Sequence, residues 1–290
     1  MSHATTLRAR AQREAGTLPA LLAQATDLAS TVLLGDHGRR RAGMGDSFWQ
    51  YRAAQPTDGL RAIDWRRSAR GDDTFVQDKE WQIAQSVLMW VDTSAAMQFR
   101  SADSLPAKAD RARLLALATA ILLNKGGERI GLTAPALAPS RGTAQIEKLA
   151  AALCTDTNTD YGTPDSTPPL AHARALYISD FLGDIAPIEA ALTKAADRGV
   201  QGVLLQILDP QEETFPFHGR TVFQSMSGTK THETLKADGL RSRYLHRLAD
   251  RKDRLTTLAR QTGWQFKTHH SDQSAISALL WLHQTIGGRA

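Results

Sequence analysis

The sequence predicts an α/β protein with a doubly wound, mostly parallel sheet, and three observations support this fold class. From Ser86 onward, short apolar runs alternate with segments of helical periodicity, which is typical of βαβ units. Residues 87–91 are apolar at every position, which predicts a strand covered on both faces. Three predicted strands end in an aspartate, as expected where polar side chains collect at the carboxyl edge of an open sheet.

The remaining elements follow in chain order. Leu114, Leu117 and Ile121 recur at helical spacing within residues 108–125, and Gly126 ends that helix. The same patterns predict further strands over 130–133, 176–179, 203–208 and 264–268, and further helices over 145–153, 185–198, 241–262 and 274–286. A small hairpin around a glycine is expected from residues 221–225 and 229–234.

The first 85 residues have a different character, and we expect domains at 1–85 and 86–290. A helical segment near 18–28 precedes a stretch rich in Arg, Gly and Trp. This N-terminal extension is expected to pack on the α/β domain, because water is a poor environment for its large aromatic side chains, Phe48, Trp49, Trp65 and Trp81.

Composition excludes several classes of protein. With 290 residues, 42% hydrophobic and 22% charged, the chain can bury a sizeable core and is ordinary for a globular protein. Its single cysteine, Cys154, cannot form an internal disulfide or a cysteine-based zinc site, which favours a reducing compartment. No secretory signal and no apolar run of roughly 18 residues is present, so we expect a cytoplasmic protein without a membrane partner.

The positive charge is concentrated near the N-terminus. Residues 1–70 contain 11 arginines and 6 acidic residues, which accounts for the whole formal net charge of +5. Such a region can face nucleic acid, an anionic surface or an acidic protein, because all three use the same Coulomb attraction. Interleaved acids such as Asp58, Asp64 and Asp73 favour a salt-bridged region or a protein-facing patch over nucleic acid.

Asp92, Asp180 and Asp209 follow three predicted strands directly. Because ligands of open parallel sheets bind at the carboxyl ends of the strands, these side chains are expected to converge there. Asp92 and Asp180 could together hold magnesium, with hydroxyls of Ser94 and of a nearby threonine completing an oxygen shell. The alternative is that each aspartate is a turn residue or a helix N-cap.

The segment DTSAAM, residues 92–97, resembles the metal-ion-dependent adhesion site of von Willebrand factor A domains, whose pattern is D-x-S-x-S. Asp92 and Ser94 match the first two ligands, whereas Ala96 replaces the second serine and weakens any magnesium site. Asp180 resembles the later aspartate of that site. The resemblance leaves the threonine ligand open among Thr155, Thr159 and Thr163, with Thr159 in the expected set.

A second resemblance covers roughly residue 35 to the C-terminus. The segment GMGDSFWQYRAAQPTDGLRAIDWRRSARGDDTFVQDKEWQ is similar to the signature of the domain of unknown function 58 family. Ala54 and Thr57 depart from the R-x-Y-x-x-G-D-x-x-R-x-I-D-W-x-x-S-A-R pattern of that family. The residues that match it are Arg52, Asp58, Arg61, Ile63, Asp64, Trp65, Ser68, Ala69 and Arg70.

This family resemblance implies a von Willebrand factor A-like fold, no demonstrated catalysis, and partnership with a MoxR-type AAA+ ATPase. The family's precedent is an adaptor that couples ATP-driven remodelling to maturation of a client protein. Considered without the family, Arg61, Asp64, Arg67 and Arg70 mix charges at intervals that allow local pairing, which permits either a local salt-bridge network or a surface that binds the acidic face of a partner.

Three functions compete at this point. The leading hypothesis is a non-enzymatic binding module whose carboxyl edge either holds magnesium or docks a partner without metal. Its rival is a magnesium-dependent phosphoesterase that uses Asp92, Asp180 and Asp209, although the sequence shows no general base or phosphate-binding cation beside Asp92. Nucleic-acid binding through the Arg-rich segment is the third. No phosphate-binding loop occurs, so the chain itself is not expected to hydrolyse ATP.

Overall fold

The computed structural model describes residues 19–33, 48–55, 63–71, 73–79, 85–165, 171–229 and 231–287. Contacts divide the chain into a main unit, Met1–Gly35 with Gln85–Ala290, and a small unit, Asp36–Ala84. The domains expected at 1–85 and 86–290 stay a prediction; in the division by contacts, the N-terminal helix over residues 19–33 belongs to the main unit. Packing of the small unit on the main unit stays a prediction.

The main unit is built on a six-stranded sheet in the order β10-β7-β6-β3-β4-β5. Every neighbouring pair is parallel except β4 and β5, which are antiparallel. The mostly parallel α/β fold predicted from the sequence is therefore confirmed. The strands are β3 (Ser86–Val91), β4 (Arg129–Ala134), β5 (Leu137–Ser140), β6 (Arg174–Ser179), β7 (Gln201–Leu208) and β10 (Gln265–His270).

The strand order reverses between β3 and β6. From β3 the chain adds β4 and β5 on one side, and then crosses to place β6, β7 and β10 on the other. A switch point of this kind leaves a crevice at the carboxyl ends of the two central strands, where ligands of doubly wound folds bind. The residues that directly follow these strands are Asp92 and Asp180.

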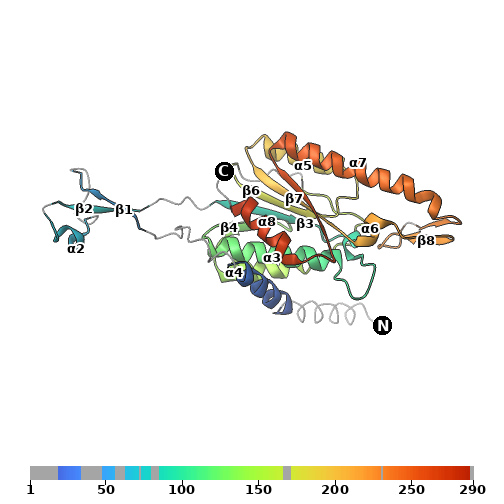
Figure 1. Ribbon diagram of the computed structural model, residues 1–290, viewed down its shortest axis with the longest axis horizontal. Coiled ribbons are helices and arrows are strands. Elements are labelled where there is room, and N and C mark those ends of the chain that lie inside the picture. Colours follow the sequence, from blue (N-terminus) through green and yellow to red (C-terminus); the bar gives the residue numbers. More distant parts are fainter. Residues whose placement is uncertain are drawn as a thin grey trace. The chain divides into compact units, whose positions relative to one another are not determined.

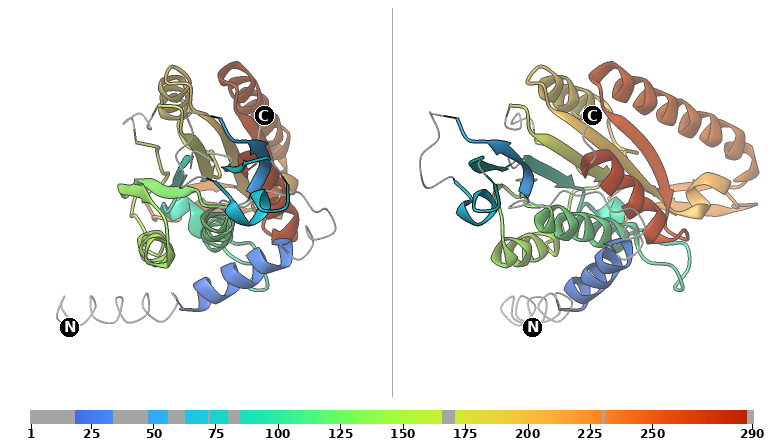
Figure 2. Two further views of the ribbon diagram at one scale, coloured as in Figure 1. Left: turned by 90° about the vertical axis from the view of Figure 1, so that its left-hand side faces the viewer. Right: turned by 60° about the vertical axis from the view of Figure 1, so that its left-hand side comes forward.

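Helices cover both faces of the sheet (Figure 1). The helices α3 (Lys108–Lys125), α4 (Thr143–Leu153) and α8 (Ala275–Gly287) lie on one face, and α5 (Ala186–Ala196) and α7 (Asp238–Thr262) lie on the other (Figures 1 and 2). Because side chains alternate along a strand, Met89 packs into the core under α3 while its neighbour Trp90 packs into the core under α5 and α7. The helix over residues 19–33 joins the first core through Ala25 and Ala29.

Short elements follow β7 and precede the long helix α7. The helix α6 (Pro210–Thr214) leads to the antiparallel hairpin of β8 (Thr221–Gln224) and β9 (Thr231–Thr234). The hairpin predicted around Gly228 is thus confirmed. That glycine has φ +75°, a left-handed conformation that glycine adopts without steric cost.

The small unit pairs β1 (Phe48–Ala53) with β2 (Phe75–Lys79) and carries the short helix α2 (Trp65–Ser68). Asp64 is the N-cap of α2, because its carboxylate accepts a hydrogen bond from the Arg67 backbone at 3.1 Å. Trp65 is 60% exposed, although the sequence analysis expects it to be covered. The helix α2 is a single turn with no buried residue, and cover of Trp65 by the main unit stays a prediction.

Within the described part of the chain, no helix is both long enough and apolar enough to cross a lipid bilayer.

Candidate functional site at the carboxyl edge of the sheet

Asp92 lies at the end of β3 and is only 3% exposed. Its Oδ1 accepts a hydrogen bond from the Ser94 backbone at 2.9 Å, and its Oδ2 accepts one from Ser179 Oγ at 2.7 Å. Burial raises the pKa of the Asp92 carboxyl, and the neighbouring Asp180 charge raises it further. The two aspartates expected at the switch point therefore do lie close enough to interact.

The loop that follows α4 closes over Asp92. Backbone N–H groups of Ala95 and Ala96 donate to the carbonyls of Thr159 and Asp160 at 2.9 and 3.0 Å. A Cβ atom at Gly162 would lie 2.2 Å from Asp92 Oδ1, so only glycine permits this close approach. The carboxylate is thus enclosed by the loop rather than presented to solvent.

Asp180, at the end of β6, forms a buried ion pair with Lys108. The Lys108 Nζ atom lies 2.8 Å from Asp180 Oδ2 and 2.6 Å from Glu212 Oε1. Burial alone would lower the pKa of Lys108, but the two carboxylates outweigh it and raise the pKa, so the ammonium stays charged. Lys108 is thus a buried cation at the carboxyl edge of the sheet, whereas its sequence position predicts only the start of a helix.

Asp209, at the end of β7, is the N-cap of α6. Its Oδ1 accepts from the Gln211 backbone and its Oδ2 from the Ser101 backbone, both at 2.9 Å. The Glu212 Oε2 atom accepts a hydrogen bond from the Asp209 backbone N–H at 2.8 Å, which completes a capping box. For Asp209 the helix-cap alternative raised by the sequence is therefore the one observed.

The three edge aspartates share a feature that limits their chemistry. Each of their carboxylate oxygens accepts a hydrogen bond from the protein. For Asp180, the second of these bonds comes from the Leu182 backbone N–H to Oδ1 at 3.0 Å. Hydrogen bonds to a carboxylate stabilise the charged, fixed form and hold it in place. The three side chains are therefore fixed in orientation by the surrounding backbone and side chains.

The hydroxyl groups expected to bind magnesium differ in their burial and in their hydrogen bonds. Ser94 is fully buried beside Asp92, and its Oγ has no hydrogen-bond partner among the described residues. The backbone carbonyl of Thr159 accepts a hydrogen bond from the Ala95 N–H. The Thr159 hydroxyl lies 3.2 Å from the Thr157 hydroxyl. The other two candidate threonines, Thr155 and Thr163, are exposed.

These donors do not fit a magnesium ion. Each oxygen of Asp92 and of Asp180 already accepts a hydrogen bond from the protein, and Ala96 offers no oxygen. Lys108 already supplies a buried positive charge to Asp180, and a divalent cation beside it would meet Coulomb repulsion. Among the residues that the structure describes, no three His, Cys, Asp or Glu side chains converge as a metal site.

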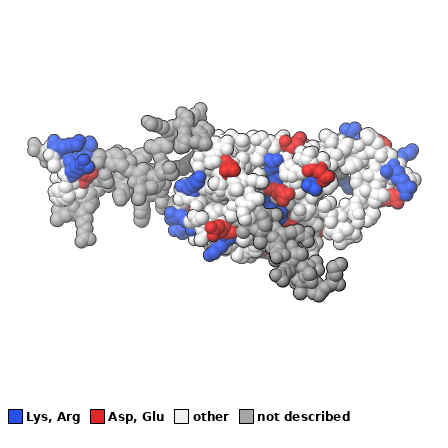
Figure 3. Space-filling view, turned by 90° about the horizontal axis from the view of Figure 1, so that it is seen from below, with Lys and Arg blue, Asp and Glu red and all other residues white. Residues whose placement is uncertain are grey.

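The signature residues of the small unit are only partly described. Arg52 lies on β1, and Asp58 and Arg61 fall outside the described residues. Asp64 caps α2, Trp65 is exposed, and Arg70 is exposed just after that helix. Lysine and arginine side chains gather on the surface of this unit (Figure 3).

The sequence matches one family profile over most of the chain. The family described as "Protein of unknown function DUF58" matches residues 50–254, which include the signature segment and the carboxyl edge. Curated relatives include uncharacterized proteins of Mycobacterium bovis and of two strains of Mycobacterium tuberculosis. Each is 28% identical over 236 residues, which is 74% of this chain and 73% of the relative.

Two solved structures are similar at low identity. One is a conserved hypothetical protein BatB from Bacteroides thetaiotaomicron, with a TM-score of 0.42. The other is described as an aerotolerance-related membrane protein from Bacteroides fragilis, with a TM-score of 0.40. Both are 12% identical, and each match covers 71% of this chain and all of the solved chain.

Proposed function

The chain belongs to the DUF58 family of proteins of unknown function, and from this premise we propose that it is a non-enzymatic adaptor that binds a partner protein at the carboxyl edge of its sheet. One observation carries the proposal. The carboxyl edge carries Asp92 and Asp180 at the switch point and Asp209 beside them at the end of β7, and hydrogen bonds fix all three. In this proposal the buried carboxylates fix the shape of the edge that the partner contacts, and they carry no chemistry of their own.

We assign the main unit to the von Willebrand factor A type. The support is topological: counted along the chain, the six sheet strands have the spatial order 3-2-1-4-5-6, and the strand at the β5 edge is antiparallel. The D-x-S segment follows the first strand, β3, as the sequence resemblance implies.

We further propose that binding at this edge is independent of metal. In this view the Lys108 ammonium takes the role that a cation would have beside Asp180, and the adhesion-like site is degenerate. A protein-supplied ammonium has three donors, of which Asp180 and Glu212 use two. The edge is then complete without a cofactor.

The proposed partner is a MoxR-type AAA+ ATPase, as the family resemblance implies, and the client protein that the pair acts on is left open. We place the adaptor in the cytoplasm, where its single cysteine would stay reduced. Tyr161 is the side chain that we expect a partner to contact. It is 42% exposed, and its Cβ lies only 2.7 Å from the position of a Cβ at Gly183, just beyond β6.

Binding can be measured by biolayer interferometry with the MoxR-type ATPase from the same organism immobilised in the presence of ATP. We expect saturable binding that Tyr161→Ser weakens by about tenfold or more, because aromatic side chains dominate interface energies. Leu280→Ser is the matched control, since Leu280 is 38% exposed in the middle of α8. Absence of binding by the wild-type chain would refute the proposal.

Metal dependence is best measured on the chain alone. Isothermal titration with magnesium chloride is expected to give no saturable heat for the wild type or for Asp92→Ala. Saturable binding that Asp92→Ala abolishes would restore the metal-dependent version of the site. Release of phosphate from a generic phosphomonoester, lost on substitution of Asp92, would support the phosphoesterase instead.

A further inference from the structure

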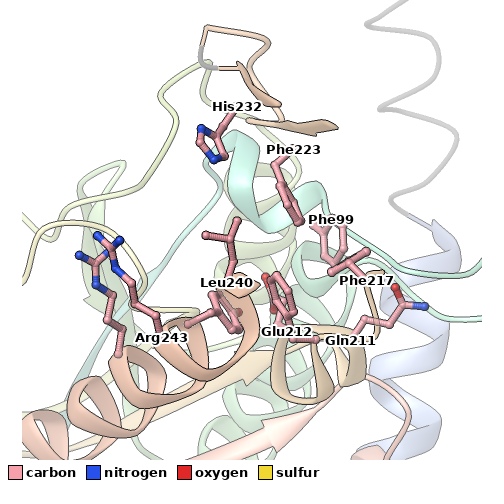
Figure 4. Close-up of a pocket in the computed structure, with 11 residues that line it drawn as sticks. Phe99, Gln211, Glu212, Phe217, Phe223, His232, Leu240 and Arg243 are labelled. Carbon is pink, nitrogen blue, oxygen red and sulfur yellow. The ribbon is translucent and has the colours of Figure 1, made fainter. Parts of the chain in front are cut away.

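A pocket of about 550 Å³ lies between α6, the β8–β9 hairpin and the start of α7. Figure 4 shows Phe99, Phe217 and Phe223 on one side of it and Arg243 on the other, with His232 near the hairpin. Its size is in the range of pockets that enclose a drug-sized ligand or one or two large side chains. No residue of this pocket was selected in the sequence analysis as a site residue.

The aromatic side chains that form one wall of the pocket pack against one another. Phe215 stacks on Phe223 at 5.7 Å between ring centroids, and it also contacts Phe217 and Tyr244 at 5.1 and 4.9 Å. Phe215 ends α6 with φ +44°, a left-handed conformation that is uncommon for a non-glycine residue and is often found at functional sites. The wall is therefore preformed and apolar.

The open side of the pocket is positively charged. Arg243 and Arg247 lie four residues apart on α7, on one face of the helix, and both are exposed. Neither forms an ion pair with any residue that the structure describes. The carboxylate of the lining, Glu212, is held by Lys108 rather than by either arginine, so the pocket presents two guanidinium groups to an occupant.

The surroundings favour a protein segment as the occupant. Three of the seven exposed large hydrophobic side chains in the described chain, Val222, Met226 and Leu235, belong to the hairpin segment beside the pocket. Exposed apolar side chains gathered near a pocket are typical of protein interaction sites. A second copy of this chain is a poorer candidate, since it has a net charge of +5 and the same arginines.

Single-stranded nucleic acid fits less well. Base stacking needs free ring faces, but the rings of Phe215, Phe223 and Tyr244 stack on or tilt against one another. A phosphate backbone also needs an extended basic groove rather than one concave apolar pocket flanked by two arginines.

We propose that this aromatic pocket binds a linear segment of the partner protein in which an apolar anchor side chain is flanked by carboxylates. The anchor fills the space against Phe217 and Phe223, and the carboxylates pair with Arg243 and Arg247. The inference rests on the proposed adaptor function and deepens it by naming the chemistry of the partner. Glu212 connects the two sites, because it lines the pocket and also binds Lys108 at the sheet edge.

The probe is a fluorescein-labelled short peptide with a Phe-Leu pair between aspartates, followed by fluorescence anisotropy against the full chain. We expect binding that Arg243→Glu with Arg247→Glu weakens by about tenfold or more. Arg260→Glu is the matched control, because this arginine is exposed on the same helix away from the pocket. Circular dichroism checks that each variant is folded.

Two altered peptides test the two halves of the proposal. Replacing Phe-Leu by serines, or the aspartates by lysines, is expected to abolish binding. Equal binding of all three peptides, or of the acidic peptide to the double variant, would overturn the inference. So would displacement of the acidic peptide by oligothymidine at lower concentration, which would assign the pocket to nucleic acid.

The ATPase and peptide measurements together distinguish failure of the adaptor function from failure of the pocket inference. If the wild-type chain fails to bind the ATPase, the adaptor function fails, and the peptide measurement alone decides the chemistry of the pocket. If the ATPase binds the wild type and the peptides do not discriminate, the adaptor function stands and the pocket inference fails.

Discussion

The Lys108 ammonium nitrogen lies 2.8 Å from Asp180 Oδ2, and both side chains are 1% exposed. The pair joins the first residue of α3 to the carboxyl end of β6. Glu212 is the second partner of the lysine, at 2.6 Å, and its side chain is 15% exposed. Removing one member of such a cluster leaves a buried charge without its counterion.

Lys108→Met is expected to lower the free energy of unfolding by about 3 to 5 kcal/mol, because Asp180 and Glu212 would then face each other without a cation. Urea denaturation at pH 7 measures the loss. Lys125→Met at the exposed end of the same helix serves as the control and should change stability by less than about 0.5 kcal/mol. A loss of similar size in both variants would contradict the buried ion pair.

Asp92→Asn tests the cost of a buried carboxylate. The pKa of Asp92 is raised in the folded state, so the folded chain binds the proton more tightly and loses stability as pH rises above the usual carboxyl pKa. Asparagine removes this loss while it can still accept from Ser94 and contact Ser179. Urea denaturation at pH 7 should show Asp92→Asn at least as stable as the wild type, with the difference shrinking toward pH 4.

Asp92→Ala is the companion variant and should be less stable than the wild type by about 1 to 3 kcal/mol, since the Ser94 N–H and the Ser179 hydroxyl lose their acceptor. If Asp92→Asn were as unstable as Asp92→Ala, the negative charge itself would be stabilising, which would indicate a bound cation.

His269 predicts a loss of stability in acid. It is 1% exposed on β10, and burial, with a contribution from Arg111, lowers its pKa to about 4. The unfolded chain takes up this proton near pH 6.5, so stability falls as pH drops from about 6.5 toward 4, by up to about 1.4 kcal/mol per pH unit.

His269→Gln removes this titration and should flatten the pH dependence of stability over the same window. The comparison uses urea denaturation of both proteins between pH 7 and pH 4.5, where the carboxylates titrate alike in each. Parallel curves for the two proteins would show that His269 does not titrate with a lowered pKa.

Gly162→Ala is expected to destabilise the main unit by about 1 to 3 kcal/mol, because the added methyl group meets the Asp92 carboxylate. Gly239→Ala is expected to stabilise the main unit instead. Gly239 lies in the first turn of α7 with open space around its Cβ position, so alanine should stabilise by about 0.5 to 1 kcal/mol. Thermal unfolding of the two variants should therefore shift in opposite directions from the wild type.

The sheet could be predicted from local patterns because β3, β6 and β7 are largely apolar and each is followed directly by an aspartate. Residues 87–91 and 203–208 were expected as strands and lie within β3 and β7. The edge strand β5 was missed. It contains Pro139, which argues against a central strand but is tolerated at a sheet edge.

The ion-pair cluster could not be predicted because its members are far apart in the sequence. Lys108 and Glu212 are separated by 104 residues and meet only after α6 folds onto the carboxyl edge. One local signal was present. A lysine at the first residue of a helix opposes the helix dipole, which indicates that a nearby anion compensates it.

The two hydrogen bonds that the Glu212 carboxylate accepts affect how an occupant binds in the aromatic pocket. One of its oxygens holds Lys108 and the other holds the start of α6, so this wall of the pocket is tied to α3 on the opposite face of the sheet. The conformational entropy of the wall is then lost when the protein folds rather than when it binds. Entry of an occupant should need little reorganisation, and substitutions at Glu212 should act mainly by returning that entropy cost to the binding step.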